Sequence, residues 1–423
     1  MFALCFSGVA FGALDSTLSS AYLPDILRTF APNGDEGELG RVGAYINFAF
    51  LIGSGVGGMG LSALADHLGR RAVFALALLC YGVSSGVGAV ATSWEWLAVS
   101  RVGVGVGVGT ALVVSAVILT EAWPAASRAV VLGVLSVAYP VGIIASGLVV
   151  AQVPSWRVAL GAGAVPAVLA LPAWVVVQDS TAWRAVRFAV SASVRSPERL
   201  GDYWREVSGG VLIYGTMLIG LWATFAWLPT WVESRLTGAG SSGGAAEASA
   251  SAAQALRASS VILLGAGGLI GGPVSGFFAN RFGRQPVQAA CFVLCFGLSF
   301  LLFRVSDGFS WHQQAGILAL GLCFGVSQGV LNAFVPALFP AALAGTATAL
   351  CFHAGRVLTA FAVFFVGALV VWFGGYGSAM FAFAQVYLLG LAAMWWLHRV
   401  SVVAAAERGL PAARSQPMDA DRS

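Results

Sequence analysis

The chain has 423 residues, of which 58% are hydrophobic and only 9% charged, and its mean hydropathy is +0.85. A soluble domain carries roughly 25% charged residues. The composition therefore excludes a soluble protein and indicates a polytopic membrane protein. The net charge of +4 does not indicate a nucleic-acid partner, because the basic residues flank the apolar runs instead of forming one basic face.

Twelve transmembrane helices are predicted, because each long apolar run is close to the length that spans a bilayer and none alternates as a strand would. In chain order they cover residues 2–23, 42–64, 72–92, 96–120, 129–151, 157–177, 209–232, 258–279, 286–305, 313–338, 344–372 and 376–397. The first run begins at Met1 without a basic stretch, which favours a helix over a cleaved signal.

The helices divide the chain into two predicted bundles. Residues 1–177 form the first six-helix bundle and residues 209–397 the second. Residues 178–208 are a cytoplasmic linker and residues 398–423 a cytoplasmic tail. The low-complexity stretch 236–258 is expected to be a flexible external loop.

Arginine placement orients the predicted helices. With both termini in the cytoplasm, fourteen arginines lie in inside segments and six in outside segments, as the positive-inside rule requires. The expected location is a bacterial-type plasma (inner) membrane, and a monomer is expected.

The six cysteines all lie within apolar runs, where they are interpreted as small buried hydrophobic residues. They have no zinc-ligand spacing, and all 22 basic residues are arginine, so lysine Schiff-base chemistry is excluded. No cofactor or metal is expected. With no histidine cluster and no nucleophile near a base, the sequence does not favour an enzyme.

A repeated motif lies between the second and third helices of each half. The copies are ALADHLGRRAVF (residues 63–74) and FFANRFGRQPVQ (residues 277–288), offset by 214 residues. The glycine allows a tight reversal and the arginines hold the loop inside. The gating residues predicted from these loops are Asp66, Gly69, Arg70, Arg71, Asn280, Arg281, Gly283 and Arg284.

Two in-register copies of this motif resemble the loop signature of the major facilitator superfamily. The resemblance implies an all-α membrane protein with two pseudo-symmetric six-helix bundles, a central site between them and alternating access. The chain departs from the pattern at Ser62, where glycine is usual, at His67, often arginine, and at Asn280, the acid of the second copy.

A further predicted gate follows the fourth helix, in LTEAWPAASRAV. Glu121 is expected to pair with Arg70 or Arg71 when the inner side is closed, with Arg128 nearby. An exposed pair contributes only about 0–1 kcal/mol, which suits a contact that must open. The alternative is a solvated loop charge.

Two charges inside the first bundle are predicted to face each other. Asp15 lies about ten residues from the external edge and Arg101 about six, so at about 1.5 Å per residue their depths differ by roughly 6 Å. Such a pair can exchange its ion pair for a proton and thereby drive transport. The alternative is a static ion pair that braces the bundle.

Arg356 is the only full charge between Leu343 and Phe373, at an expected depth of roughly 20 Å. His353, three residues earlier, shares its helical face. A cation here suits a substrate carboxylate; the alternative is pairing with Asp15 or with helix carbonyls. Gln328 and Asn332 could add polar contacts or simply join helices.

Other segments indicate which branch of the superfamily the chain resembles. TEAWPAASRA, WLPTWVE (residues 227–233) and ALFPAALAGTATALCFHAGRV (residues 337–357) together are similar to metabolite:proton symporters of the sialate, monocarboxylate and aromatic-acid branches. The expected function is proton-coupled uptake of a small organic anion. The alternatives are a drug or metabolite efflux antiporter of the same fold and a non-transporting membrane protein.

Overall fold

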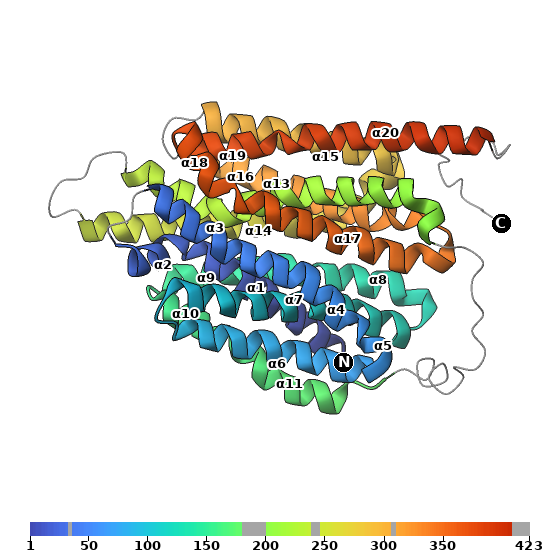
Figure 1. The fold of residues 1–423 in the computed structure, drawn as a ribbon, viewed down its shortest axis with the longest axis horizontal. Helices are drawn as coiled ribbons and strands as arrows, with labels where there is room; N and C mark the ends of the chain where they lie inside the picture. Colours follow the sequence, from blue (N-terminus) through green and yellow to red (C-terminus); the bar gives the residue numbers. More distant parts are fainter. Residues whose placement is uncertain (33–35, 180–199, 238–245, 306–309, 408–423) are drawn as a thin grey trace.

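The computed structural model describes residues 1–32, 36–179, 200–237, 246–305 and 310–407, and these ranges contain helices and no strand (Figure 1). Twelve of the helical segments are long and apolar enough to cross a membrane. The all-α fold class and the number of spans are therefore confirmed. Most of the predicted linker, residues 180–199, and residues 408–423 of the predicted tail lie outside the described residues, so the domain boundaries stay a prediction.

The first half of the chain contains eleven α-helices and one π-helix, η1, in the described residues. In order they are α1 (Phe2–Ala21), α2 (Leu23–Phe30), α3 (Glu36–Ile52), η1 (Gly53–Gly57), α4 (Gly58–Ala63), α5 (Ala65–Leu68), α6 (Arg70–Ala89), α7 (Trp94–Ala122), α8 (Ala125–Ser136), α9 (Ala138–Gln152), α10 (Trp156–Ala162) and α11 (Val165–Val176).

The second half contains eight α-helices, two short 3₁₀ segments and a second π-helix in the described residues. They are η2 (Leu200–Tyr203), α13 (Trp204–Thr237), α14 (Ala246–Phe282), α15 (Arg284–Phe300), η3 (Leu301–Val305), α16 (Trp311–Phe334), η4 (Pro336–Leu338), α17 (Ala341–Phe364), α18 (Val366–Phe373), α19 (Tyr376–Ala384) and α20 (Val386–Glu407).

The helix breaks follow local sequence. Proline removes the hydrogen bond to the residue four positions earlier, and Pro140 marks the place where the fifth span divides into α8 and α9. The predicted helix 344–372 ends instead at Phe364, in a run of Phe and Val, residues of modest helix propensity.

The predicted external loop 236–258 is wrong over its second part. Residues 246–258 form the first turns of α14, because the run AAEASASAAQALRA is rich in alanine, the strongest helix former. Residues 238–245 of that loop lie outside the described residues.

Glycines let α7 approach its neighbours on two faces. A Cβ added at Gly109 would lie 2.9 Å from Ser54 Oγ, and one at Gly107 would lie 2.7 Å from Tyr81 Cβ. The run GVGVGVG (residues 103–109) therefore packs α7 between η1 and α6, as expected of small residues at helix interfaces in membranes.

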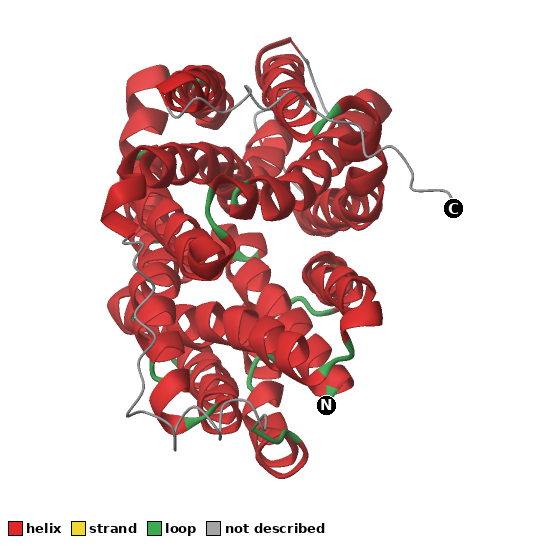
Figure 2. Ribbon diagram, turned by 90° about the vertical axis from the view of Figure 1, so that its right-hand side faces the viewer, coloured by secondary structure: helices red, strands yellow, loops and turns green. Residues whose placement is uncertain are grey.

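The two halves meet along three groups of helices. α3 packs against α17 and α18, α9 against α14, and α1 against α13 and α14. The α3–α17 contact is aromatic, with the ring centroids of Phe48 and Phe361 at 5.6 Å and those of Tyr45 and Phe364 at 5.1 Å. Figure 2 shows the helices of the two halves end-on. In contrast, α4, α5 and α8 pack mainly within their own half.

The helix bundle has two ends, which we call the signature end and the α2 end. The signature end carries Gly69 and Gly283, and α1 begins and α20 ends on this side (Figure 1). The α2 end carries α2 and lies at the opposite end of the bundle.

Candidate substrate and coupling site

Asp15 and Arg101 form an ion pair inside the first half. Arg101 Nη1 lies 3.2 Å from Asp15 Oδ1, and neither side chain is exposed to solvent. Ser85 Oγ on α6 shares its one proton between the same oxygen, at 3.0 Å, and the Leu160 carbonyl, at 2.9 Å. The prediction that Asp15 and Arg101 face each other is confirmed.

Glycines make room for this pair. Gly163 lies between α10 and α11, and a Cβ there would come 3.1 Å from Asp15 Oδ1. At Gly88 a Cβ would come 3.4 Å from Arg101 Nη2. Asp15 Oδ2 and Arg101 Nε and Nη2 have no hydrogen-bond partner among the described residues. The pair is thus buried and bonded through only one carboxylate oxygen.

Arg356 on α17 lies between the two halves. Its side chain is buried and donates a hydrogen bond to Ser54 Oγ on η1, and it lies beside the Tyr139 hydroxyl on α9. The Arg356 guanidinium carbon lies 4.9 Å from the ring centroid of Phe352 and 6.0 Å from that of Trp222.

No acidic side chain pairs with Arg356 in the part of the chain that the structure describes, and its Nε has no hydrogen-bond partner there. The considered pairing with Asp15 is therefore not formed, because Arg101 occupies that carboxylate. A buried guanidinium surrounded by a hydroxyl, a phenol and aromatic rings remains able to bind an anion.

His353 lies on the same side of α17 as Arg356, as its spacing predicted. It is buried, adjoins Ser54, and its ring centroid lies 5.6 Å from that of Phe352. Its Nδ1 has no hydrogen-bond partner in the described residues.

Asn332 on α16 connects to the aromatic side of this site. Its Oδ1 accepts a hydrogen bond from the Tyr214 hydroxyl at 3.0 Å, and the Tyr214 ring meets Phe352 edge-on at 5.7 Å. Gln328, one turn earlier, is half-buried, and its Nε2 has no partner among the described residues. The structure thus brings Asn332 toward the rings around Arg356 and shows no contact that does the same for Gln328.

Five residues around Arg356 were not predicted as site residues from the sequence: Ser54, Tyr139, Trp222, Phe352 and Tyr214. The available signal for Ser54 was its place in GSGVGGMG, where dense glycine is unusual for a helix interior. There the structure has the π-helix η1, a rare element that often marks functional sites.

The two loop signatures adopt the same backbone turn. Gly69 has φ 97° and ψ 150°, and Gly283 has φ 89° and ψ 152°, conformations that side chains other than glycine rarely adopt. Arg70 pairs with Glu121 at 3.0 Å, so the predicted Arg70–Glu121 contact is present. Arg71 stacks instead on Trp174 at 4.3 Å, and its backbone N–H donates to Asp179.

Two of the remaining predicted gating residues, Arg128 and Arg284, also bond within their own half. Arg128 donates to the Trp123 carbonyl at 3.2 Å and Arg284 to that of Ala333 at 3.1 Å. Arg281 lies 6.0 Å from the Phe282 ring, and Asn280 is exposed. The side chain of Asp66 lies outside what the structure describes. At the signature end, these contacts therefore brace each half separately.

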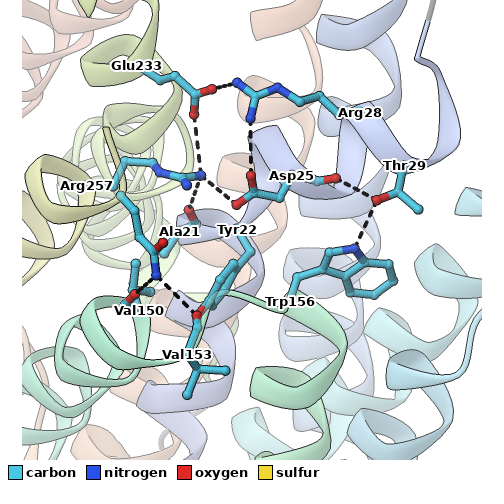
Figure 3. Close-up of polar contacts among 11 residues, drawn as sticks. Ala21, Tyr22, Asp25, Arg28, Thr29, Val150, Val153, Trp156, Glu233 and Arg257 are labelled. Atoms are coloured by element: carbon cyan, nitrogen blue, oxygen red, sulfur yellow. Dashed lines mark hydrogen bonds and ion pairs between the residues drawn. The ribbon is translucent and has the colours of Figure 1, made fainter. Parts of the chain in front are cut away.

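A cluster of charges joins the halves at the α2 end (Figure 3). Arg257 on α14 pairs with Asp25 on α2 at 2.8 Å and with Glu233 on α13 at 3.4 Å. Arg28 pairs with both acids, with Asp25 at 3.3 Å. We call these four residues the α2-end cluster.

A backbone contact supports the α2-end cluster. Gln254 Nε2 on α14 donates to the Val150 carbonyl on α9 at 2.6 Å, and Tyr22 donates to the Val153 carbonyl beside it (Figure 3). This contact was not predicted, because Gln254 and Arg257 fall in the stretch that was expected to be a loop.

Comparison with known proteins agrees with this architecture. A family model described as Major Facilitator Superfamily matches residues 4–362. The chain is 25% identical over 380 residues to a "Probable 4-methylmuconolactone transporter" from Cupriavidus pinatubonensis, covering 86% of this chain and 82% of that one. It is 23% identical over 401 residues to a "Gallate transporter" from Pseudomonas putida, covering 87% and 84%. A solved D-xylose-proton symporter shares the fold, with a TM-score of 0.74 at 18% identity over 99% of both chains.

Proposed function

The chain belongs to the major facilitator superfamily, and from that premise we propose that it takes up a small organic carboxylate together with protons. It is a transporter and not an enzyme, as its family and its relatives indicate. The proposal concerns what it carries, which residues bind the cargo, and how the cargo is coupled to protons.

The observation that carries the substrate proposal is Arg356. The residue is 3% exposed, its guanidinium lies between the halves, and it has only neutral partners among the described residues. An uncompensated buried charge costs several kcal/mol, and a substrate carboxylate would offset this cost with charge-assisted hydrogen bonds. The position between two moving halves is where a transporter of this fold must hold its cargo.

The rings around Arg356 favour a cargo with a flat or apolar body. Phe352 and Trp222 of the second half lie against the Arg356 guanidinium, and Tyr214, whose ring lies next to Phe352, bonds Asn332. Gallate, for which one relative is named, is an aromatic carboxylate. His353 lies near this site through Ser54 and Phe352, whereas the proposed role of Gln328 rests only on its position one turn before Asn332 on α16.

Asp15 is proposed as the proton-binding residue, with Arg101 as its counter-ion. Protonation of Asp15 would remove the ion pair and leave a buried cation, so each protonation state favours a different packing around Arg101. The next residue, Ser16, lies 3.3 Å from the Tyr139 hydroxyl, which adjoins Arg356. Through α1 the proton site therefore contacts the substrate site.

Orientation and gating complete the proposal. The arginine distribution favours a signature end that faces the cytoplasm of a bacterial cell, with both termini inside. The α2-end cluster then closes the external side. The inner gate is proposed to form from the loops at the signature end as the two halves rock together. Gly69 and Gly283 make the turns of these loops. The other gate residues are Asp66, Arg70, Arg71, Glu121, Arg128, Asn280, Arg281 and Arg284.

The proposal is tested by uptake into proteoliposomes of labelled gallate, cis,cis-muconate and benzoate, with and without an inward proton gradient. The expected result is gradient-driven accumulation of at least one carboxylate, lost in Arg356→Ala and partly kept in Arg356→Lys. Arg304→Ala is the matched control, because Arg304 is exposed and bonds Ser378 in its own half. If Arg356→Ala transports every carboxylate like the wild type, Arg356 does not bind substrate. Export in exchange for protons would instead support the antiporter alternative.

A further inference from the structure

The acceptor of the Arg356 hydrogen bond lies on an unusual element of the opposite half. Ser54 is fully buried, and it lies in the π-helix η1 that interrupts the span between α3 and α4. Its hydroxyl accepts from Arg356, 302 positions later in the chain, so this bond crosses the interface between the halves.

The position of the Ser54 hydroxyl is fixed by close packing on two sides. On one side is α7, where a Cβ at Gly105 would lie 2.8 Å from Ser54 N and one at Gly109 would lie 2.9 Å from Ser54 Oγ. On the other side is α17, where a Cβ at Gly55 would lie 2.8 Å from Val357 Cγ2 and 3.5 Å from the His353 carbonyl. Because Gly55 has no side chain, the η1 backbone lies directly against α17.

Ser54 also lies on a path to the proton site. The helix that holds η1 in place is α7, and Arg101, the partner of Asp15, is one turn before Gly105 on that helix. Tyr139, the other polar neighbour of Arg356, adjoins Ser16, the residue after Asp15. Both polar neighbours of Arg356 therefore belong to elements that pack against α7 and α1, the helices that carry Arg101 and Asp15.

We propose that Ser54 is the positioning residue for Arg356 and competes with the substrate carboxylate for its N–H group. When the carboxylate takes over this hydrogen bond, η1 loses its side-chain tie to α17, and the halves become free to separate at that contact. When the carboxylate leaves, Ser54 again satisfies the buried guanidinium and lets the empty transporter return. This inference rests on the proposed function, in which Arg356 binds the substrate.

For Ser54→Ala we expect opposite effects on substrate binding and on net uptake. Substrate should bind more tightly, because a competing acceptor is gone, by about 12- to 140-fold, the range for one hydrogen bond to a charged group. Net uptake should slow by a similar factor, because the empty transporter must return with a less well satisfied guanidinium. Exchange of internal for external substrate does not need that return step and should remain within about twofold of the wild type.

The experiment uses the full chain in proteoliposomes, with labelled gallate and benzoate as probes. It measures apparent KM, net uptake and counterflow exchange for the wild type, for Ser54→Ala, and for Ser146→Ala as the matched control. Ser146 is equally buried, and within the described residues its hydroxyl bonds only the Ile143 carbonyl of its own helix. If the alanine variant does not fold, Ser54→Cys keeps a side chain of similar size with a weaker acceptor and serves the same test.

The outcomes separate the inference from the proposed function. Lower KM with slow net uptake and normal exchange supports the role of Ser54. Unchanged KM, or net uptake and exchange that fall together, overturns it while leaving Arg356 as the substrate residue. If the wild type transports no carboxylate, the proposed function fails, and the inference fails with it.

Discussion

Neutralising Arg257 should open the α2 end of the transporter. Arg257 is nearly buried, at 5% side-chain exposure, and it contacts two acids that reach it from the two halves, Asp25 of the first and Glu233 of the second. In Arg257→Gln the amide can keep one hydrogen bond, but both ion pairs are lost. When the halves separate at this end, water can solvate the same groups, so the substitution penalises the closed form more than the open one.

The magnitude follows from these contacts. A hydrogen bond to a charged group contributes about 1.5–3 kcal/mol. Arg28 still pairs with both acids in the variant. The stabilisation of the closed form that is lost is therefore near the lower end of this range, about 2 kcal/mol. At about 1.4 kcal/mol for each tenfold change, the ratio of open to closed molecules should rise by about 30-fold.

The assay uses the Ser20→Cys variant and measures how fast a charged, membrane-impermeant thiol reagent modifies this cysteine from the solution that the α2 end faces. Ser20 is 2% exposed and lies five residues before Asp25, so its modification requires the α2 end to open. Arg304→Gln is the control, since it removes the same charge from a residue that bonds within one half. A modification rate no faster in Arg257→Gln than in Arg304→Gln would refute the reasoning that this cluster holds the halves together.

Two further predictions concern the proposed proton-binding residue Asp15 and the glycine turn at Gly283. Asp15→Asn should abolish pH-driven accumulation and preserve counterflow, because the ionisable group is replaced by an amide of the same shape; loss of neither activity would remove Asp15 from the mechanism. Gly283→Ala should lower the free energy of unfolding by about 1–3 kcal/mol, because alanine is strained at φ 89°. Its control, Gly297→Ala, lies in a helix with open space around the added methyl group, and a thermal shift equal to that control would contradict the strain argument.

The features that could be predicted were local in the chain or repeated along it. Apolar length gave the twelve spans, and the paired signatures gave the equivalence of Gly69 and Gly283, which the matching backbone angles confirm. Counting residues from the span edges was enough to place Asp15 opposite Arg101, because helical rise is constant. The contact of Arg70 with Glu121 followed from the adjacency of two loops.

The features that could not be predicted depend on how the halves meet. Arg356 was identified by its charge, but its acceptor Ser54 is a small polar residue of a kind that is common in membrane helices. Nothing in the single sequence shows that η1 and α17 touch. Arg257 was missed for another reason: low complexity suggested a loop where alanine builds a helix, and the helix carries Arg257 to Asp25.

The ion pairs described at the two ends differ in what they connect. Arg257 and Asp25 join one half to the other, whereas Arg70 and Glu121 join helices of the same half. Dissolved salt weakens charge interactions over about 8–10 Å at physiological strength, more strongly where water reaches them. Ionic strength in the solution at the α2 end therefore acts on the balance between conformations, while at the signature end it acts on the stiffness of a single bundle. The rate of transport should thus depend on the salt concentration on one side of the bilayer.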